Sequence, residues 1–212
     1  MREITPGGDR ARPSWRIGSI CVYCGSSPGD EPAFADAAQD IGRRMAESRI
    51  ELVYGGGDVG LMGIVARAVL QHGGRVTGII PEFLRRRENM LADAQELIVV
   101  PDMHSRKQLM FERADAFVAL PGGIGTLEEL VEQMTWAQLG RHAKPILLLD
   151  VRGFWTPFLA LIAHMRRHGF IRPGLELNYL VAERGEEVLS MLSDAVRRRA
   201  DAGEAAFVAE HF

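Results

Sequence analysis

Short runs of apolar residues alternate with amphipathic stretches along the chain from Ile17 onward. These runs are apolar throughout, which is typical of strands that are buried on both faces of a parallel sheet. The predicted strands are Ile17–Tyr23, Glu51–Tyr54, Arg75–Ile80, Leu97–Val100, Ala116–Leu120, Ile146–Asp150 and Leu180–Ala182. Between and after them, helical periodicity predicts helices at Phe34–Glu47, Leu61–Gln71, Ser105–Ala114, Thr126–Leu139, Pro157–His168 and Glu186–Arg199.

This alternation predicts an α/β protein with a single-domain, doubly wound, Rossmann-like fold and a mostly parallel sheet of six or seven strands. The domain is expected over residues 16–198, after a polar and disordered lead-in (residues 1–15) and before a loose polar tail (residues 199–212). The lead-in lacks the apolar core of a signal peptide, and the longest apolar run is too short to span a bilayer. We therefore expect a cytoplasmic protein that does not act at membranes.

Three of the predicted strands end in loops of small residues, namely Cys24–Ser27, Gly55–Asp58 and Pro121–Thr126. Ligands of doubly wound folds bind outside the carboxyl ends of the strands, so these loops should meet at one edge of the sheet. There, Gly25, Ser26, Gly56 and Gly57 are expected to contribute to a ligand site.

The loop from Pro121 to Thr126 joins a predicted strand to a predicted helix. Its glycines let the backbone turn tightly, and the N–H groups at the start of the helix can bind an anion. Thr126 is expected to cap the helix and to reach a phosphate oxygen. No lysine follows the glycines, so this is not a Walker loop. From this loop alone, a plain glycine-rich turn with Glu129 in a capping box explains the sequence equally well.

Two carboxylates, Glu128 and Glu129, follow in the first helical turn. A carboxylate near a bound phosphate also lies near the attached sugar, where it can stabilise an oxocarbenium-like transition state or activate water. Neighbouring helical residues point in different directions, so only one of the two should reach the ligand. We favour Glu129.

The segment Met103–Lys107 opens the helix after the fourth predicted strand and carries two adjacent cations, Arg106 and Lys107. Cations oppose the dipole at the amino end of a helix, which slightly disfavours a purely solvent-exposed role. An arginine here can hold a phosphate or ribose oxygen with two hydrogen bonds. His104 is interpreted as a capping or packing residue rather than a base.

The bulk composition narrows the function further. The formal net charge is −3, which disfavours nucleic acid as a partner. Cys21 and Cys24 form a C-x-x-C pair, but the chain has no second pair, so buried structural cysteines are favoured over a zinc or redox site. The run from Gly55 to Gly60 matches the dinucleotide fingerprint G-x-G-x-x-G, which leaves an NAD(P)-dependent oxidoreductase as a weak alternative.

Together these motifs resemble the Lonely Guy family of cytokinin-activating phosphoribohydrolases, which are often mislabelled as lysine decarboxylases. The family signature P-G-G-x-G-T-x-x-E occupies Pro121–Glu129, and its basic motif occupies Met103–Lys107. The runs Val53–Gly57, Val59–Gly63 and Thr135–Gly140 are also similar to family motifs. The resemblance extends from about Arg16 to Ala195; the basic stretch Arg85–Asn89 departs from the family pattern.

The resemblance implies hydrolysis of the N-glycosidic bond of cytokinin riboside 5′-monophosphates, and of AMP, by a homodimer that needs no metal or other cofactor. It implies that Arg106 and Glu129 are the catalytic pair. With the loop residues above, the expected substrate-binding residues are Gly25, Ser26, Gly56, Gly57, Glu88, Met103, Arg106, Lys107, Gly122, Gly123, Ile124, Gly125, Thr126, Leu127, Glu128, Glu129 and Thr135.

Two alternatives can be weighed against this hydrolase. A pyridoxal-phosphate decarboxylase needs a lysine for its Schiff base, and neither of the two lysines, Lys107 and Lys144, lies in a suitable context. A non-catalytic nucleotide-binding or molybdenum-cofactor-binding carrier or sensor stays open as the second hypothesis. Retention of Arg106 and Glu129 favours the enzyme.

Overall fold

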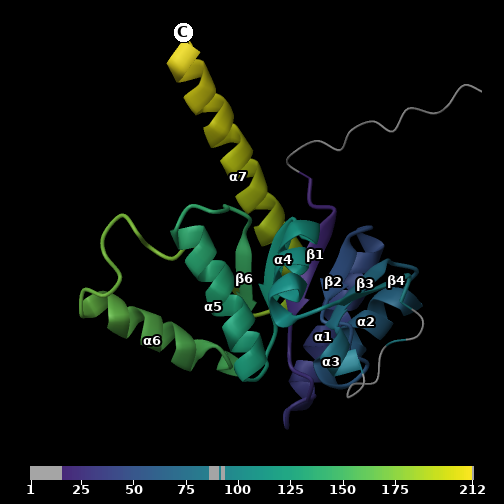
Figure 1. Cartoon of the computed structure of the whole chain (residues 1–212). Helices are drawn as coiled ribbons and strands as arrows, with labels where there is room; N and C mark the ends of the chain where they lie inside the picture. Colours follow the sequence, from purple (N-terminus) through teal and green to yellow (C-terminus); the bar gives the residue numbers. More distant parts are fainter. Residues whose placement is uncertain (1–15, 86–90, 92–93, 212) are drawn as a thin grey trace, which may run out of the picture.

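A computed structural model describes residues 16–85, 91 and 94–211, and within them it contains one sheet of seven parallel strands, so the predicted fold class is confirmed (Figure 1). The strands are β1 Ser19–Tyr23, β2 Glu51–Tyr54, β3 Val76–Pro81, β4 Glu96–Val100, β5 Ala116–Ala119, β6 Ile146–Leu149 and β7 Leu180–Ala182. The helices are α1 Pro32–Glu47, α2 Gly60–Gln71, α3 Glu82–Arg85, α4 Met103–Arg113, α5 Ile124–Gln138, α6 Thr156–Arg167 and α7 Gly185–His211. A short 3₁₀ helix spans Val151–Gly153.

The strands are ordered β4-β3-β2-β1-β5-β6-β7, so the chain moves outward from β1 in one direction and then outward from β5 in the other. Helices α1, α2 and α7 cover one face of the sheet, while α4 and α5 cover the other. The point where the strand order reverses therefore lies between β1 and β5. In doubly wound folds the ligand crevice opens at this point, beyond the carboxyl ends of the two strands.

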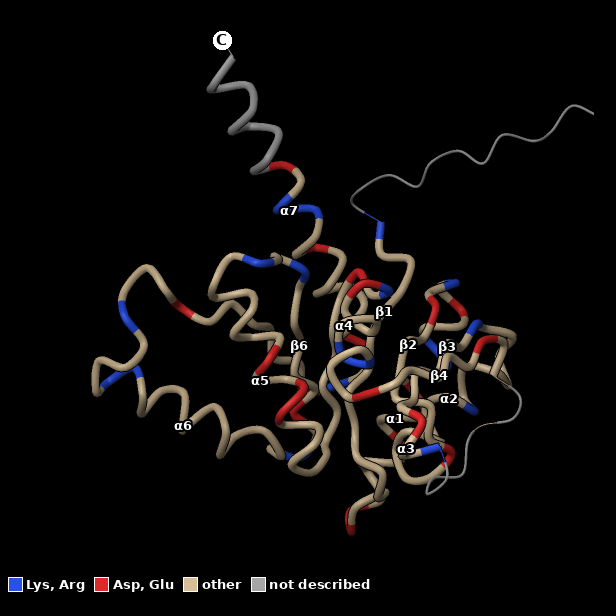
Figure 2. The backbone as a smooth tube through the Cα atoms, in the orientation of Figure 1, with Lys and Arg blue, Asp and Glu red and all other residues tan. Residues whose placement is uncertain are grey.

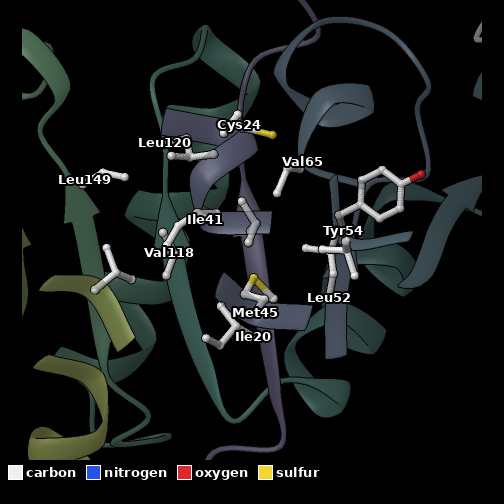
Figure 3. Packing of buried hydrophobic residues seen from close by; sticks show 14 of the residues in the cluster. Ile20, Cys24, Ile41, Met45, Leu52, Tyr54, Val65, Val118, Leu120 and Leu149 are labelled. Carbon is white, nitrogen blue, oxygen red and sulfur yellow. The ribbon is translucent and has the colours of Figure 1, made fainter. Parts of the chain in front are cut away.

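Alternate residues of each central strand face opposite layers, as the 2-residue period of a strand requires. On β1, Ile20 and Val22 pack under α1, whereas Cys21 and Tyr23 pack under α4 and α5. Figure 3 shows the first of these layers, in which Ile41 and Met45 of α1 lie over Ile20 and Val118 of the sheet. The hydrophobic cores on both faces of the sheet are tightly packed. The central strands therefore hold the loops at their ends in fixed positions.

Two helix ends differ from the predicted ones, namely the start of α4 and the end of α7. Helix α4 begins at Met103 rather than Ser105, because the Asp102 carboxylate accepts a hydrogen bond from the Ser105 backbone N–H at 2.7 Å. Helix α7 continues to His211, past Arg199, where the sequence predicted a loose tail. The sequence from Arg199 onward was predicted to be loose although it contains Phe207 and Val208, but the backbone keeps its helical hydrogen bonding to His211. Among the described residues, no helix combines the length and apolarity needed to cross a bilayer.

Candidate active site

A cavity of about 280 Å³ opens between the carboxyl ends of β1 and β5, at the point where the strand order reverses. Its wall combines the loops after these strands with side chains from α2, α4 and α5. The residues that line it are Cys24, Gly25, Ser26, Met62, Arg106, Gly123, Ile124, Gly125, Thr126 and Glu129. Eight of these ten were predicted from the sequence; Cys24 and Met62 were not.

The amino end of α5 forms one side of the cavity. Gly123 occupies the N-cap position, and its lack of a side-chain cap leaves the N–H groups of the first turn facing outward. Thr126 was predicted to cap this helix, but it lies inside the first turn, where its side chain is buried against Gly122. The capping box with Glu129, which was the alternative interpretation of this loop, is likewise not formed. This turn therefore offers backbone donors and a helix dipole to an anion.

The loops after β1 and β5 are held together by a backbone hydrogen bond, in which Gly25 N–H donates to the Pro121 carbonyl at 3.0 Å. A Cβ on Gly25 would lie 3.3 Å from the Gly122 Cα and 3.0 Å from the Ser27 carbonyl oxygen. Glycine at position 25 therefore allows the two loops to approach closely, and the loop that leads into α5 is fixed to the end of the central strand β1.

Arg106 projects from the first turn of α4 across the carboxyl end of the sheet. Its Nε donates to the Ile79 carbonyl of β3 at 3.2 Å, and its guanidinium lies against the backbone of Gly55 after β2. A Cβ at Gly55 would collide with the guanidinium, so only glycine leaves room for this conformation. The sequence predicted Gly56 and Gly57 as ligand residues and identified Gly55 only as the first glycine of the G-x-G-x-x-G run.

We expect that Gly55→Ala will lower kcat/KM by about 10- to 100-fold without unfolding the protein, because the added methyl group displaces the Arg106 guanidinium by about an ångström or more. The measurement is steady-state kinetics together with far-ultraviolet circular dichroism. In an Arg106→Ala background the same Gly55→Ala change should have little further effect. An equal loss in both backgrounds would mean that Gly55 does not act through Arg106.

Glu129 faces Arg106 across the cavity, with 3.6 Å between its Oε1 and the Arg106 Nη2, and both side chains are only 11% exposed. Burial raises the pKa of Glu129 to about 7, although the positive charge of Arg106 acts in the opposite direction. A carboxyl group with this pKa exchanges a proton near neutral pH. That property suits a group that takes a proton from water during a reaction.

The two cysteines do not form a reactive pair. Cys21 on β1 packs on the α4 and α5 side of the sheet, whereas Cys24, directly after β1, packs on the α1 and α2 side, and both are free thiols in buried positions. Burial raises the pKa of the Cys24 thiol well above its usual range, so this wall of the cavity stays uncharged. The predicted structural role of these residues agrees with this geometry.

Several other predicted ligand residues lie away from the cavity. Lys107 is paired with the carboxylates of Glu128 and Glu132, and Thr135 is exposed on the outer side of α5, where its hydroxyl donates to the Val131 carbonyl at 2.8 Å. Gly56, Gly57, Met103, Leu127 and Glu128 also do not line the cavity. Glu88 lies outside the described residues.

A second recess of about 280 Å³ adjoins the cavity, and the two share Gly25, Ser26 and Gly123. Gly122, another predicted ligand residue, lines the recess. Its other walls include the apolar side chains of Phe34, Leu61 and Phe154. Phe34 and Phe154 lie outside the motifs found in the sequence, whereas Leu61 lies in the run Val59–Gly63, which was not assigned to the site.

Comparison with known proteins agrees with this fold and these motifs. Residues 62–192 match the family described as "Possible lysine decarboxylase". A rice protein named probable cytokinin riboside 5′-monophosphate phosphoribohydrolase is 46% identical over 187 residues, which cover 88% of this chain and 84% of that protein. An Arabidopsis thaliana cytokinin riboside 5′-monophosphate phosphoribohydrolase is 48% identical over 180 residues, covering 84% of this chain and 82% of that protein.

Among solved structures, the molybdenum cofactor binding protein of Rippkaea orientalis has a TM-score of 0.64 at 20% identity, and the match covers 85% of this chain and 98% of that one. The structure named TM1055 has a TM-score of 0.62 at 23% identity and covers 83% and 98% of the two chains. Similarity at this level of identity establishes a shared fold only.

The decarboxylase in the family description conflicts with the lysines of this chain. Lys107 is engaged by two carboxylates, and the Lys144 ammonium donates to the Phe111 carbonyl at 2.7 Å and lies over the Phe111 ring. Neither amine is free to form a Schiff base with a cofactor. With the cytokinin-nucleotide relatives at 46–48% identity over most of its length, the chain belongs to the Lonely Guy family.

Proposed function

We propose that this protein hydrolyses the N-glycosidic bond of cytokinin riboside 5′-monophosphates, and of AMP, to release the free base and ribose 5-phosphate. The observation that carries the proposal is the pairing of Glu129 with Arg106 in a cavity that also contains the open amino end of α5. The names of the relatives at 46% and 48% identity support the same substrate class. We also propose that the protein acts in the cytoplasm, where its two free thiols would stay reduced.

The phosphate is bound in this proposal by the N–H groups of the first turn of α5, with the helix dipole adding to the attraction. The ribose then lies between this turn and the facing side chains of Arg106 and Glu129. Arg106 has a fixed, planar set of donors with which it orients the ribose phosphate or the leaving base. Glu129 is held one helical turn beyond Gly125, close to C1′ of a sugar whose phosphate occupies the turn.

Bond cleavage proceeds through a sugar with cationic character at C1′. The C1′–N bond breaks, its electron pair leaves with the base, and the base takes up a proton from solvent. A water molecule adds to C1′ and gives its proton to the Glu129 carboxylate. The negative charge of Glu129 stabilises the cationic sugar before the water adds.

The same cavity could instead hold a nucleotide without cleaving it, as in a carrier or sensor. The molybdenum-cofactor proteins among the structural relatives share the fold at 20% identity or below, which does not favour that reading for this chain. The deciding experiment incubates the purified protein with AMP and with isopentenyladenosine monophosphate, and quantifies the free base by chromatography. Tight binding of AMP without any base release would support the carrier.

Nucleosides serve as the matched control in that experiment. Adenosine and isopentenyladenosine keep the bond to be cleaved but lack the phosphate. We expect kcat/KM for them to be lower on the order of a hundredfold, because the phosphate supplies binding energy that positions the sugar. Equal turnover of nucleosides and nucleotides would show that the amino end of α5 does not bind the substrate phosphate.

We further propose that the protein is a homodimer that associates through α5 and α6. Ile124 is 82% exposed at the start of α5, and Val131 and Leu139 extend the same apolar side of the helix. Helix α6 buries only Ile162 against its own domain and exposes Leu161 and Met165. Figure 2 shows that α6 carries no charged residue before its carboxyl-terminal end. Large exposed apolar patches on soluble proteins commonly mark association surfaces.

Val131→Asp is therefore expected to shift the protein from dimer to monomer, since a buried unpaired charge costs several kcal/mol. The measurement is sedimentation velocity over a range of concentrations. Phe83→Asp is the matched control, because Phe83 is a half-exposed hydrophobic residue on α3, near the far edge of the sheet. If Phe83→Asp dissociates the protein and Val131→Asp does not, the interface lies elsewhere.

A further inference from the structure

Lys107, the residue that follows Arg106 on α4, bridges to two carboxylates on α5. Its Nζ lies 2.6 Å from Glu128 Oε1 and 3.0 Å from Glu132 Oε1. The Lys107 side chain is 15% exposed, and it does not line the cavity. The resemblance to the family implied a contact between this lysine and the substrate, whereas here both of its partners belong to the protein.

The two helices joined by Lys107 are those that carry the facing pair. Arg106 precedes Lys107 on α4, while Glu128 and Glu132 flank Glu129 on α5. Met110 is the one fully buried residue of helix α4 and lies about one turn beyond Arg106, and the partly buried Leu109 and Phe111 pack beside it. These apolar contacts lie beyond the first turn, so the position of that turn depends more on polar contacts. The bridge from Lys107 to Glu128 and Glu132 joins it to α5 directly beside the Arg106–Glu129 pair.

We propose that Lys107 is a positioning residue, which holds the first turn of α4 against α5 and so sets the separation of Arg106 and Glu129. This inference rests on the proposed function, in which that pair acts on the ribose. A positioning lysine differs from a nucleotide-binding lysine, because the Lys107 ammonium stays paired with Glu128 and Glu132 throughout the reaction.

The bridge also controls the charge around Glu129. The groups that face or flank Glu129 are Arg106 and Lys107 on α4, Glu128 and Glu132 on α5, and Cys21, Tyr23 and Cys24 of the β1 segment. Glu128 and Glu132 raise the pKa of Glu129, and Lys107 lowers it. Loss of the lysine would leave two carboxylates unopposed beside a third, so the pKa of Glu129 should rise further.

The experiment compares wild type with Lys107→Met, Lys107→Arg, Glu132→Gln and the double variant Lys107→Met/Glu132→Gln. Lys107→Met is expected to lower kcat for AMP by about 10- to 100-fold, with KM changed by less than about threefold, because the reacting groups are misplaced while the phosphate site is intact. The acid limb of its pH–rate profile should move to higher pH. Lys107→Arg should recover most of the activity, since arginine can pair with both carboxylates.

The double variant separates positioning from substrate binding. Removal of the Glu132 charge should move the pH–rate profile back toward that of wild type. A large rise in KM with kcat unchanged, not relieved by Glu132→Gln, would assign Lys107 to the nucleotide phosphate and overturn the proposal.

A measurement without turnover keeps this test separate from that of the proposed function. The side-chain ¹³C resonance of Glu129, titrated by NMR, should report a higher pKa in Lys107→Met and a reversal in the double variant. Identical titrations in all the variants would overturn the positioning role, even for a protein that releases no base. The titration is made on Lys107→Met if its circular dichroism matches that of wild type. If it does not match, the titration is made on Lys107→Arg instead.

Discussion

Replacement of Glu129 by glutamine is expected to lower kcat for base release by about 10³-fold, because the amide can neither accept a proton from water nor oppose the positive charge on the sugar. The substitution keeps the size and shape of a side chain that is 11% exposed, so the fold should be retained. Glu112→Gln is the matched control, since Glu112 is an exposed acid on the adjacent helix α4. Its kinetics should equal those of wild type.

The pH dependence of the wild-type enzyme provides an independent check. The pKa of Glu129 is raised to about 7, so the reactive carboxylate forms as the pH rises through neutrality. We therefore expect kcat to increase between pH 6 and pH 8 and the residual rate of Glu129→Gln to lack this rise. A wild-type rate that is flat over this range, or undiminished turnover in the variant, would show that another group is responsible.

The second large effect is on stability. Burial raises the pKa of Glu129 from an ordinary 4.5 to about 7, so the folded state binds this proton more tightly than the unfolded state does. The resulting contribution to folding is fully present below pH 4.5 and is lost as the pH rises through 7. The difference between the two pKa values corresponds to about 3 kcal/mol in the free energy of unfolding.

Wild type should consequently lose about 3 kcal/mol more stability than Glu129→Gln between pH 4.5 and pH 8. Urea unfolding curves at both pH values measure this difference directly. Glu112→Gln should follow the wild-type dependence. Parallel pH dependences for wild type and Glu129→Gln would mean that folding does not raise the pKa of the Glu129 carboxyl.

The fold was largely predictable because the pattern that identifies each strand and helix lies within that element's own sequence. Each central strand is buried on both faces, so its residues form an uninterrupted apolar run, and each following helix has its own periodicity. The same rule located the site, since it places the loops after β1 and β5 at one edge. Helical geometry allowed at most one of Glu128 and Glu129 to reach the ligand; Glu129 was favoured, and it is the one that faces Arg106.

What the sequence could not supply were contacts between elements that are distant along the chain. Nothing local indicates that Gly55 must be small so that Arg106 can cross it, or that Lys107 is occupied by Glu128 and Glu132. The same holds for Phe34 and Phe154, which form the adjoining recess from two different elements. These features depend on side-chain packing in three dimensions, which no motif encodes.

The two sides of helix α5 have different roles, one toward the cavity and the core and the other toward solvent and the proposed dimer interface. Thr126, Glu129 and Gln133 face inward, while Ile124, Val131 and Leu139 face solvent. An α-helix advances about 100° per residue, so one inserted or deleted position would rotate every later side chain by that angle relative to the earlier ones. Such a change could not preserve both sides together. Variation in this helix should therefore be confined to substitutions, and gains or losses of residues should be restricted to the loops at its ends.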